Sequence, residues 1–444
     1  MTEPTAARSS VAPPDPHQIL RSRGYVGLLI MGALVGVPVA FVAYWFLVFV
    51  SKSQTWVFVS LPQDLGFDTA PVWWPVLPLM LSGLLVALSI TYLPGSSGHR
   101  PAEGLKATGA TAPRDLAGVF VASLATLCLG AVLGPEAPLI AIGSGLGALA
   151  VHLLKKDAPE QATLVIGAAG SFAAIATLLG SPLTGAFLLM EAVGLGGPVM
   201  GVILVPGLLA AGVGSLIFVG LDSWTGYGTF ALEISNIPAF GTPTLGEFGW
   251  ALVIGLVSAV AGLFIKRGAL ALQDIVDRQR ILLTPLVGLA IALLAITFQA
   301  TTDKSSQIVL FSGQDALPTL IDNAATWSVW ALVMLMVCKG LAYTLSLSSF
   351  RGGPIFPAMF IGAAFGIALS SLPGLPMIAG VAMGIGAMCV AMLGLPLVSV
   401  LLPSLLLAGD AVSLMPLVIV AVVVSYVASA RLEPRFGTSR VQTA

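Results

Sequence analysis

The chain has 444 residues, of which 57% are hydrophobic and only 9% are charged, with 19 basic residues against 20 acidic ones. A net charge so close to zero implies neither a nucleic-acid partner nor an acidic substrate. The three cysteines, Cys128, Cys338 and Cys389, lie in apolar stretches without the spacing of a metal site. We therefore expect no metal and no other cofactor.

Residues 1–22 are rich in Pro, Ala and Ser and lack the apolar core of a signal peptide, which predicts a disordered cytoplasmic tail. Long apolar runs follow, many of them near the roughly 20 residues that a helix needs to cross a bilayer. They include 27–50, 72–92, 199–221, 282–298 and 414–428. We predict an all-α polytopic membrane protein with one membrane domain over 23–432 and a short cytoplasmic tail over 433–444.

Basic residues flank both ends of this apolar region. Three arginines precede the first apolar run and three follow the last one: Arg8, Arg21, Arg23, Arg431, Arg435 and Arg440. Cytoplasmic segments of membrane proteins carry an excess of Lys and Arg. We therefore expect a multi-pass protein of the cell membrane with both termini in the cytoplasm.

Fifty glycines and 30 prolines interrupt the apolar sequence. Broken helices are tolerated inside a membrane only where they are buried in protein or line a cavity. We therefore expect cavity-lining segments at the Gly/Pro clusters, which are 94–104, 134–147, 180–185, 352–366 and 394–396. Between them, the charged segment 263–280 predicts a polar connector that divides the chain near its middle.

The two sides of that division contain related segments. "GPEAPLIAIGSGLG" at 134–147 and "GPIFPAMFIGAAFG" at 353–366 share six of 14 residues without a gap. "GSPLTGAFLL" at 180–189 and "GLPLVSVLLP" at 394–403 follow at nearly the same spacing. The pattern predicts an inverted repeat with halves at approximately 72–221 and 282–430, and a binding site where the halves meet.

Both "GP" segments predict the start of a helix inside the protein. Pro135 and Pro354 suit a first turn, and 139–151 and 358–371 contain no proline. A helix that begins there directs unpaired N–H groups and the positive end of its dipole at the cavity. Two such N-termini would favour an anion without a buried lysine or arginine.

These motifs resemble the CLC family of chloride channels and proton/chloride antiporters. Its gating motif G-[RK]-E-G-P is matched by "GPEAP" at 134–138, and its G-G-x-F-x-P motif by "GGPIFP" at 352–357. "GSPLTGAFLLMEAVG" resembles the N/S-A-P-L-x-G motif, and "SSGHRP" at 96–101 is a degraded form of G-S-G-I-P. The match covers nearly the whole membrane region and is nearest to a divergent prokaryotic ion-transport branch. The resemblance implies broken transmembrane helices in an inverted repeat.

The resemblance implies roles for residues of the first half. Glu136 takes the place of the gating glutamate, which occupies an anion site when ionised and leaves it, or takes a proton, to let chloride pass. The alternative is an acid that caps a helix at the membrane surface. Ser97 aligns with a serine that donates its hydroxyl to chloride, or is an ordinary turn residue.

In the second half the family binds the anion through backbone N–H groups after the G-G pair. Pro354 has no N–H, so Ile355 and Phe356 are the expected anion-binding residues, with apolar packing as the alternative for Phe356. Arg351 would raise the local potential or anchor the chain at an interface, and we favour the anchor. Tyr426 could supply the phenol that the family places beside the central chloride, or belong to an aromatic belt.

Antiporters of the family share a second, proton-relay glutamate, and an ungapped count places that position at Ala192, one residue past Glu191. This favours passive, channel-like conduction of an inorganic anion, with chloride first among the ions considered. Proton-coupled antiport, in which Glu191 would be the relay, is one alternative. The other is a secondary carrier of another solute with a different fold.

An enzyme is not indicated, because the three histidines are not part of H-E-x-x-H or another catalytic motif. The resemblance also implies a homodimer with one pathway per subunit, embedded in the lipid bilayer.

Overall fold

The computed structural model describes residues 20–105, 110–154, 158–194, 199–232, 234, 240–407 and 411–435. Within these ranges the chain is helical and forms no β-strand, which confirms the predicted all-α class. Most of the predicted tails, residues 1–19 and 436–444, lies outside the described ranges.

The helices fall into two series. Those of the first half are α2 (Arg23–Thr55), α3 (Leu61–Asp64), α4 (Val76–Tyr92), α5 (Leu116–Cys128), α6 (Glu136–Leu154), α7 (Glu160–Ala174), α8 (Pro182–Val193) and α9 (Val199–Thr225). Those of the second half are α10 (Leu245–Val276), α11 (Arg280–Thr302), α12 (Ala316–Asp322), α13 (Val329–Ser349), α14 (Ile355–Leu369), α15 (Met377–Leu393), α16 (Pro396–Leu406) and α17 (Ala411–Arg435).

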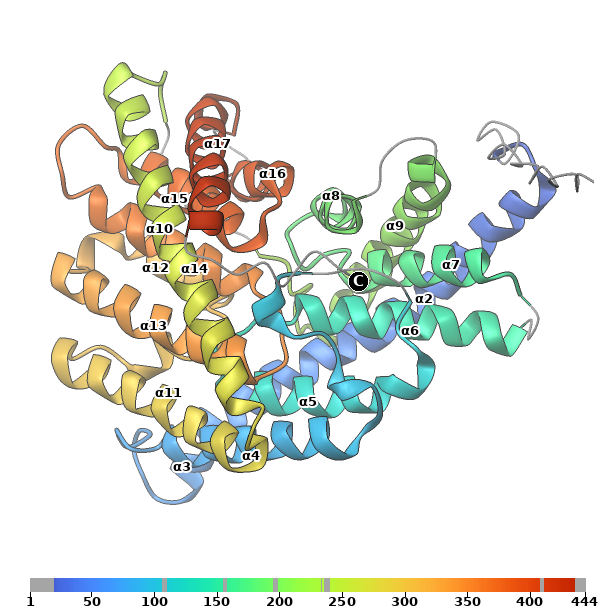
Figure 1. The fold of residues 1–444 in the computed structure, drawn as a ribbon, viewed down its shortest axis with the longest axis horizontal. Helices are drawn as coiled ribbons and strands as arrows, with labels where there is room; N and C mark the ends of the chain where they lie inside the picture. The colour runs from blue at the N-terminus through green and yellow to red at the C-terminus, as the bar shows by residue number, and fades with distance from the viewer. Residues whose placement is uncertain are drawn as a thin grey trace, which may run out of the picture.

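The two series pack in the same pattern. α2 contacts α7 and α9, and α10 likewise contacts α15 and α17. α6 lies on α7 as α14 lies on α15, and α8 lies on α9 as α16 lies on α17. Figure 1 shows α5 to α9 on one side of the molecule and α10 to α17 on the other. The two halves have the same order of helices when each is taken to begin with a long helix, α2 or α10. Both starting points lie before the predicted ones, residues 72 and 282.

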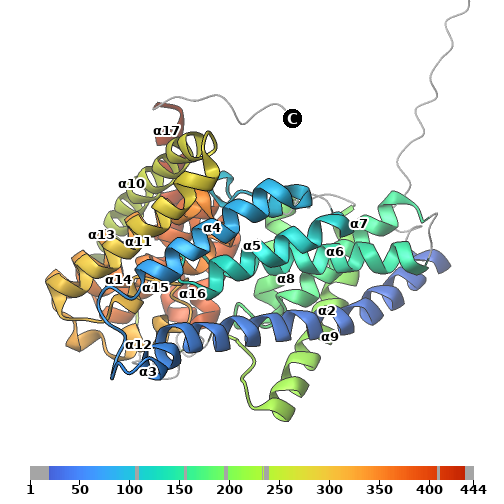
Figure 2. The same cartoon turned by 90° about the horizontal axis from the view of Figure 1, so that it is seen from below.

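The halves are joined by direct contacts between their helices. α4 packs along α11, and α8 meets α16. Figure 2 shows α2 running the length of the first half, where it packs against α5, α6, α7 and α9. The functional segments therefore lie between two structurally related bodies.

Seven helices among the described residues are long and apolar enough to cross a membrane: α2, α6, α9, α10, α11, α13 and α17. Five shorter apolar helices, α4, α8, α14, α15 and α16, accompany them. We had predicted that the charged segment 263–280 is a polar connector, and this prediction is wrong. Most of this segment is the end of α10, where Lys266 pairs with Glu433 at 3.5 Å. The charged residues continue an apolar membrane helix, and for this reason they do not form a separate polar segment.

Local sequence explains where several helices begin and end. Ser22, Ser181 and Ser328 each accept a hydrogen bond from a backbone N–H in the first turn of α2, α8 and α13. Gly194 and Gly394 follow α8 and α15 with φ of 65° and 70°, a conformation that glycine adopts without strain.

Glycines let the paired helices of each half approach closely. In the second half a Cβ at Gly366 would overlap the backbone of Gly380, and a Cβ at Gly384 would overlap that of Gly362. In the first half Gly143 and Gly170 stand in the same relation between α6 and α7. Small residues are what allow helix backbones to meet in membranes. These crossings hold α6 and α14 in place.

Replacing one of these glycines should destabilise the protein. We expect Gly384→Ala to cost about 1–3 kcal/mol, the usual cost of adding a methyl group to a packed interior. The midpoint of thermal unfolding in detergent measures the effect. Gly220→Ala is the matched control, since a Cβ at Gly220 would meet nothing within 4 Å. Equal midpoints for the two variants would contradict the close-packed crossing.

Candidate functional site

The N-termini of α6 and α14 meet at one point between the halves. Gly134 N–H donates to Gly353 O at 2.8 Å, and Gly353 N–H donates to Gly134 O at 2.7 Å, as an isolated antiparallel bridge. α6 begins at Glu136 and α14 at Ile355, each directly after a proline, as the sequence predicts. Two helix N-termini therefore face one small region.

Glu136 lies in that region and is fully buried. Its Oε1 accepts a hydrogen bond from Ile355 N–H at 2.5 Å. The backbone N–H groups of Phe356 and of Glu136 itself are near enough to favour the negative charge of the carboxylate, whereas Oε2 finds no partner among the described residues. The carboxylate thus occupies the N-terminus of α14, a position where helix geometry favours an anion.

Two glycines leave the space that this carboxylate fills. A Cβ added at Gly134 or at Gly353 would fall on the Glu136 side chain. We call the space bounded by Gly134, Gly353, Ile355 and Phe356 the Glu136 site. It holds one carboxylate, and a monatomic anion could take the place of that group.

Two cavities reach residues that flank Glu136 in the chain. One, of about 460 Å³, is lined by Ser97, Ala137, Pro138 and Arg351 among others, and we call it the Ser97 cavity. The other, of about 400 Å³, is lined by Leu133, Pro135 and Gln314 among others, and we call it the Gln314 cavity. One cavity therefore touches the residues after Glu136 and the other touches those before it. Glu136 itself lines neither cavity, and its neighbours in the chain line one or the other.

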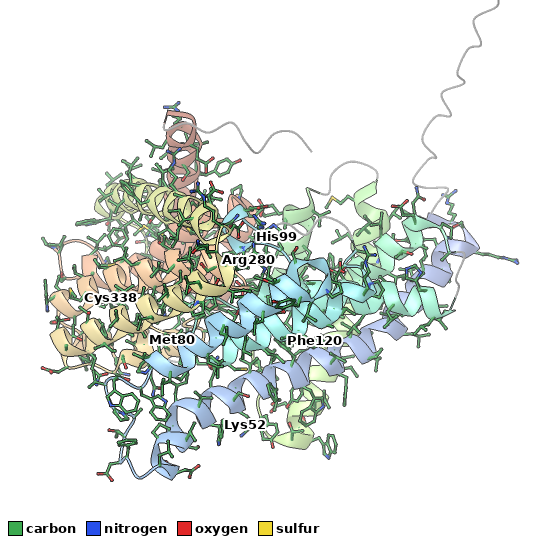
Figure 3. The ribbon with its side chains drawn as sticks, turned by 60° about the horizontal axis from the view of Figure 1, so that its bottom comes forward. Lys52, Met80, His99, Phe120, Arg280 and Cys338 are labelled. Atoms are coloured by element: carbon green, nitrogen blue, oxygen red, sulfur yellow. The ribbon has the colours of Figure 1, made fainter. Side chains whose placement is uncertain are left out.

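Ser97 is buried in an unusual turn of the Ser97 cavity wall. Residues 95 to 98 have φ of 72°, 50°, 58° and 94° in succession. The two serines of the run, Ser96 and Ser97, tolerate this conformation less readily than glycine does. The Ser97 hydroxyl lies 2.8 Å from that of Ser89. Just after this turn, Arg100 pairs at 3.1 Å with Asp277, which lies between α10 and α11. Figure 3 labels the neighbouring His99 and Arg280.

Arg351 explains how that turn is held. Its Nε and Nη2 both donate to Ser96 O at 3.3 Å, and its Nη1 donates to Phe350 O at 3.2 Å. The residue is only 6% exposed. The expectation that Arg351 anchors the chain at an interface is therefore wrong, because the guanidinium is buried and bonds Ser96 O of the first half.

The structure does not bring Tyr426 to the Glu136 site. Tyr426 lies on α17 with 42% of its surface exposed, and it lines neither cavity. The buried tyrosine beside the start of α14 is Tyr343, whose hydroxyl donates to Pro354 O at 2.7 Å. The sequence reasoning missed Tyr343, because a tyrosine within an apolar run carries no signal of its partner.

Glu191, the proposed relay acid, lies at the end of α8 and reaches across to the second half. Its two carboxylate oxygens accept hydrogen bonds from Leu397 N–H at 2.9 Å and Val398 N–H at 2.8 Å. These groups belong to the first turn of α16, where an acidic side chain is favoured. The carboxylate of Glu191 thus joins α8 to its counterpart α16.

Lys339, on α13, was also missed. It is fully buried, and its Nζ lies within hydrogen-bonding distance, 2.9 to 3.3 Å, of four carbonyl oxygens, those of Ile308, Val309, Leu310 and Phe311, which share its three N–H groups. Leu310 and Phe311 line the Gln314 cavity, so the lysine supports that wall. A lysine within the apolar run 329–349 is the signal that could have revealed it, since such residues are rare and have partners.

Comparison with known proteins agrees with this architecture. The family described as "Voltage gated chloride channel" matches residues 83–430. The protein named "Putative ion-transport protein YfeO" from Salmonella paratyphi A is 25% identical over 353 residues, which cover 79% of this chain and 82% of that protein. Its namesake from Salmonella newport has the same identity and coverage.

Two solved structures share the fold. One is a slow cyanobacterial Cl⁻/H⁺ antiporter, with a TM-score of 0.71 and 20% identity, covering 91% of this chain and 94% of that one. The other is a CLC-type fluoride/proton antiporter, with a TM-score of 0.67 and 19% identity, covering 91% and 96%.

An inverted pair of half-helices meeting at a buried carboxylate defines a membrane ion-transport protein. The chain belongs to the CLC family of voltage-gated chloride channels and related transporters. The alternative prediction, a secondary carrier with a different fold, is therefore wrong about the fold.

Proposed function

We propose that the chain conducts inorganic anions, chloride among them, passively through the Glu136 site, with Glu136 as the gate. The observation that carries this proposal is the fully buried carboxylate on the N-terminus of α14, whose chain neighbours line two cavities. An anion that moves from one cavity to the other would pass the position that the carboxylate fills. Glu136 must leave that position, by rotation or after taking a proton, before the anion enters.

The ligands of the passing anion follow from the same geometry. Ile355 and Phe356 would offer backbone N–H groups once the carboxylate has left. Ser97 would offer its hydroxyl from the Ser97 cavity. Tyr426 is not included among these ligands, because 42% of its surface is exposed and it lines neither cavity.

Passive conduction is favoured by the contacts of Glu191. A relay acid must exchange its proton with water on one side and with the gate on the other. The carboxylate of Glu191 is instead bonded through both oxygens to the backbone of α16. Proton-coupled antiport is the second candidate, because both solved structures of similar fold are described as proton antiporters.

The two modes differ under an imposed pH gradient. In vesicles with equal chloride on both sides, passive conduction predicts no net uphill chloride movement, because no proton flux is coupled to it. Uphill uptake in the wild type that disappears in Glu191→Gln would establish antiport with Glu191 as the relay. Glu160→Gln, an exposed acid in the first turn of α7, is the matched control.

We also propose that the protein is a homodimer in the cell membrane with both termini cytoplasmic. Exposed apolar side chains on α9 and α17, such as Leu216 and Val423, offer lipid-facing or subunit contacts. Cross-linking of single cysteines on these helices in the native membrane, between two differently tagged copies, tests the dimer.

A further inference from the structure

The Glu136 site has few hydrogen-bond donors for a site at two helix N-termini. The first four N–H groups of an α-helix have no partner within the helix. For α6 these positions are 135 to 138, and for α14 they are 354 to 357. Two of the four are proline in each helix: Pro135 and Pro138, and Pro354 and Pro357. Half of the expected N–H donors are therefore absent, in the same pattern in both halves.

The neighbouring donors are already engaged. The N–H groups of Gly134 and Gly353 bond each other's carbonyl oxygens. The Tyr343 hydroxyl donates to Pro354 O, and the Arg351 guanidinium donates to Ser96 O and Phe350 O. The fully buried Oε2 of Glu136 has no partner among the described residues, although the carboxylate lies between both helix ends. The N–H groups left for an anion are thus those of Glu136 and Ala137 in the first turn of α6 and those of Ile355 and Phe356 in the first turn of α14.

A site with few donors discriminates between anions by hydration. An anion that enters must exchange water for the groups of the site, and polar contacts that are not replaced cost free energy. The hydration free energy of the halides weakens in the order fluoride, chloride, bromide, iodide. The penalty in a donor-poor site is therefore largest for fluoride and smallest for iodide.

We propose that the Glu136 site selects large, weakly hydrated monovalent anions over chloride and fluoride, and that Pro135 and Pro354 determine this specificity. The proposal rests on the proposed anion conduction and adds its substrate class. Each of the two prolines stands immediately before its helix, at a position where any other residue would carry an N–H without a partner inside the helix. Pro138 and Pro357 remove a further donor from each first turn.

Anion fluxes from vesicles containing the full chain test the proposal, with fluoride, chloride, bromide and iodide as the probes. The wild type should conduct in the order iodide, bromide, chloride, fluoride. Pro354→Ala and, separately, Pro135→Ala should raise the chloride-to-iodide flux ratio by about twofold to tenfold, the equivalent of one net hydrogen bond. Pro182→Ala, the same change at the start of α8, should leave the ratio unchanged.

Two results would overturn the inference. One is a wild-type order with chloride or fluoride first, a measurement that needs no variant. The other is a flux ratio in both folded proline variants equal to that of Pro182→Ala. Either result, with flux that still depends on Glu136, leaves anion conduction in place and removes only the selectivity. An absence of flux for all four halides would instead remove the proposed function.

Discussion

Vesicles containing Glu136→Gln are expected to pass anions at a rate that no longer varies with pH. In the wild type the ionised carboxylate competes with the anion for the N–H groups of Ile355 and Phe356. Raising the pH therefore lowers wild-type flux, by up to about tenfold per unit once the carboxylate is mostly ionised. A neutral amide cannot ionise, so the variant should keep at high pH the rate that the wild type reaches only in acid.

The measurement is halide efflux across a series of symmetric pH values. Glu160→Gln serves as the control because it also removes an acid from the first turn of a helix, in this case an exposed one on α7. It should retain the wild-type profile. A profile in Glu136→Gln that still falls with pH would show that another group gates the pathway.

Gly353→Ala should abolish anion flux at every pH. A Cβ at Gly353 would fall on the position of the Glu136 carboxylate, and the anion is proposed to use the same position. The flexible glutamate can move away from the methyl group, but the anion has no other place between the two helix N-termini. The added methyl therefore blocks the site even when the gate is open. The block should persist in the Gly353→Ala, Glu136→Gln double variant.

Gly340→Ala on α13 is the matched control, because a Cβ there would meet nothing within 4 Å. Both variants should elute as folded protein in detergent, and only Gly353→Ala should lose flux. Wild-type flux in folded Gly353→Ala would place the anion pathway elsewhere.

Much of this arrangement is visible in the sequence, for a physical reason. The helix starts at Glu136 and Ile355 follow from proline, which fixes the local backbone, and the related segments at 134–147 and 353–366 do begin equivalent helices, α6 and α14. The site contacts of Ile355 with Glu136 then follow from placing two such ends together. Local backbone rules and an internal repeat are enough to predict this part.

The partners of single polar side chains could not be predicted in the same way. Arg351 bonds Ser96 O, whose position depends on how the two halves dock, and Tyr343 bonds Pro354 O, whose position depends on how the chain turns between α13 and α14. Apolar residues occur on every face of α17, so the sequence does not reveal that the ring of Tyr426 is exposed. The end of α10 was misjudged because its charges pair across the fold, as Lys266 does with Glu433.

The central claim is that an anion and the Glu136 carboxylate use the same site. Anomalous diffraction from Glu136→Gln crystals grown with bromide tests it most directly, since bromide is located without reference to flux. The account predicts a bromide peak within hydrogen-bonding distance of Ile355 N and Phe356 N, weakened or absent in wild-type crystals at high pH. Bromide bound elsewhere between the two cavities, with the space between Gly134 and Gly353 empty, would contradict it.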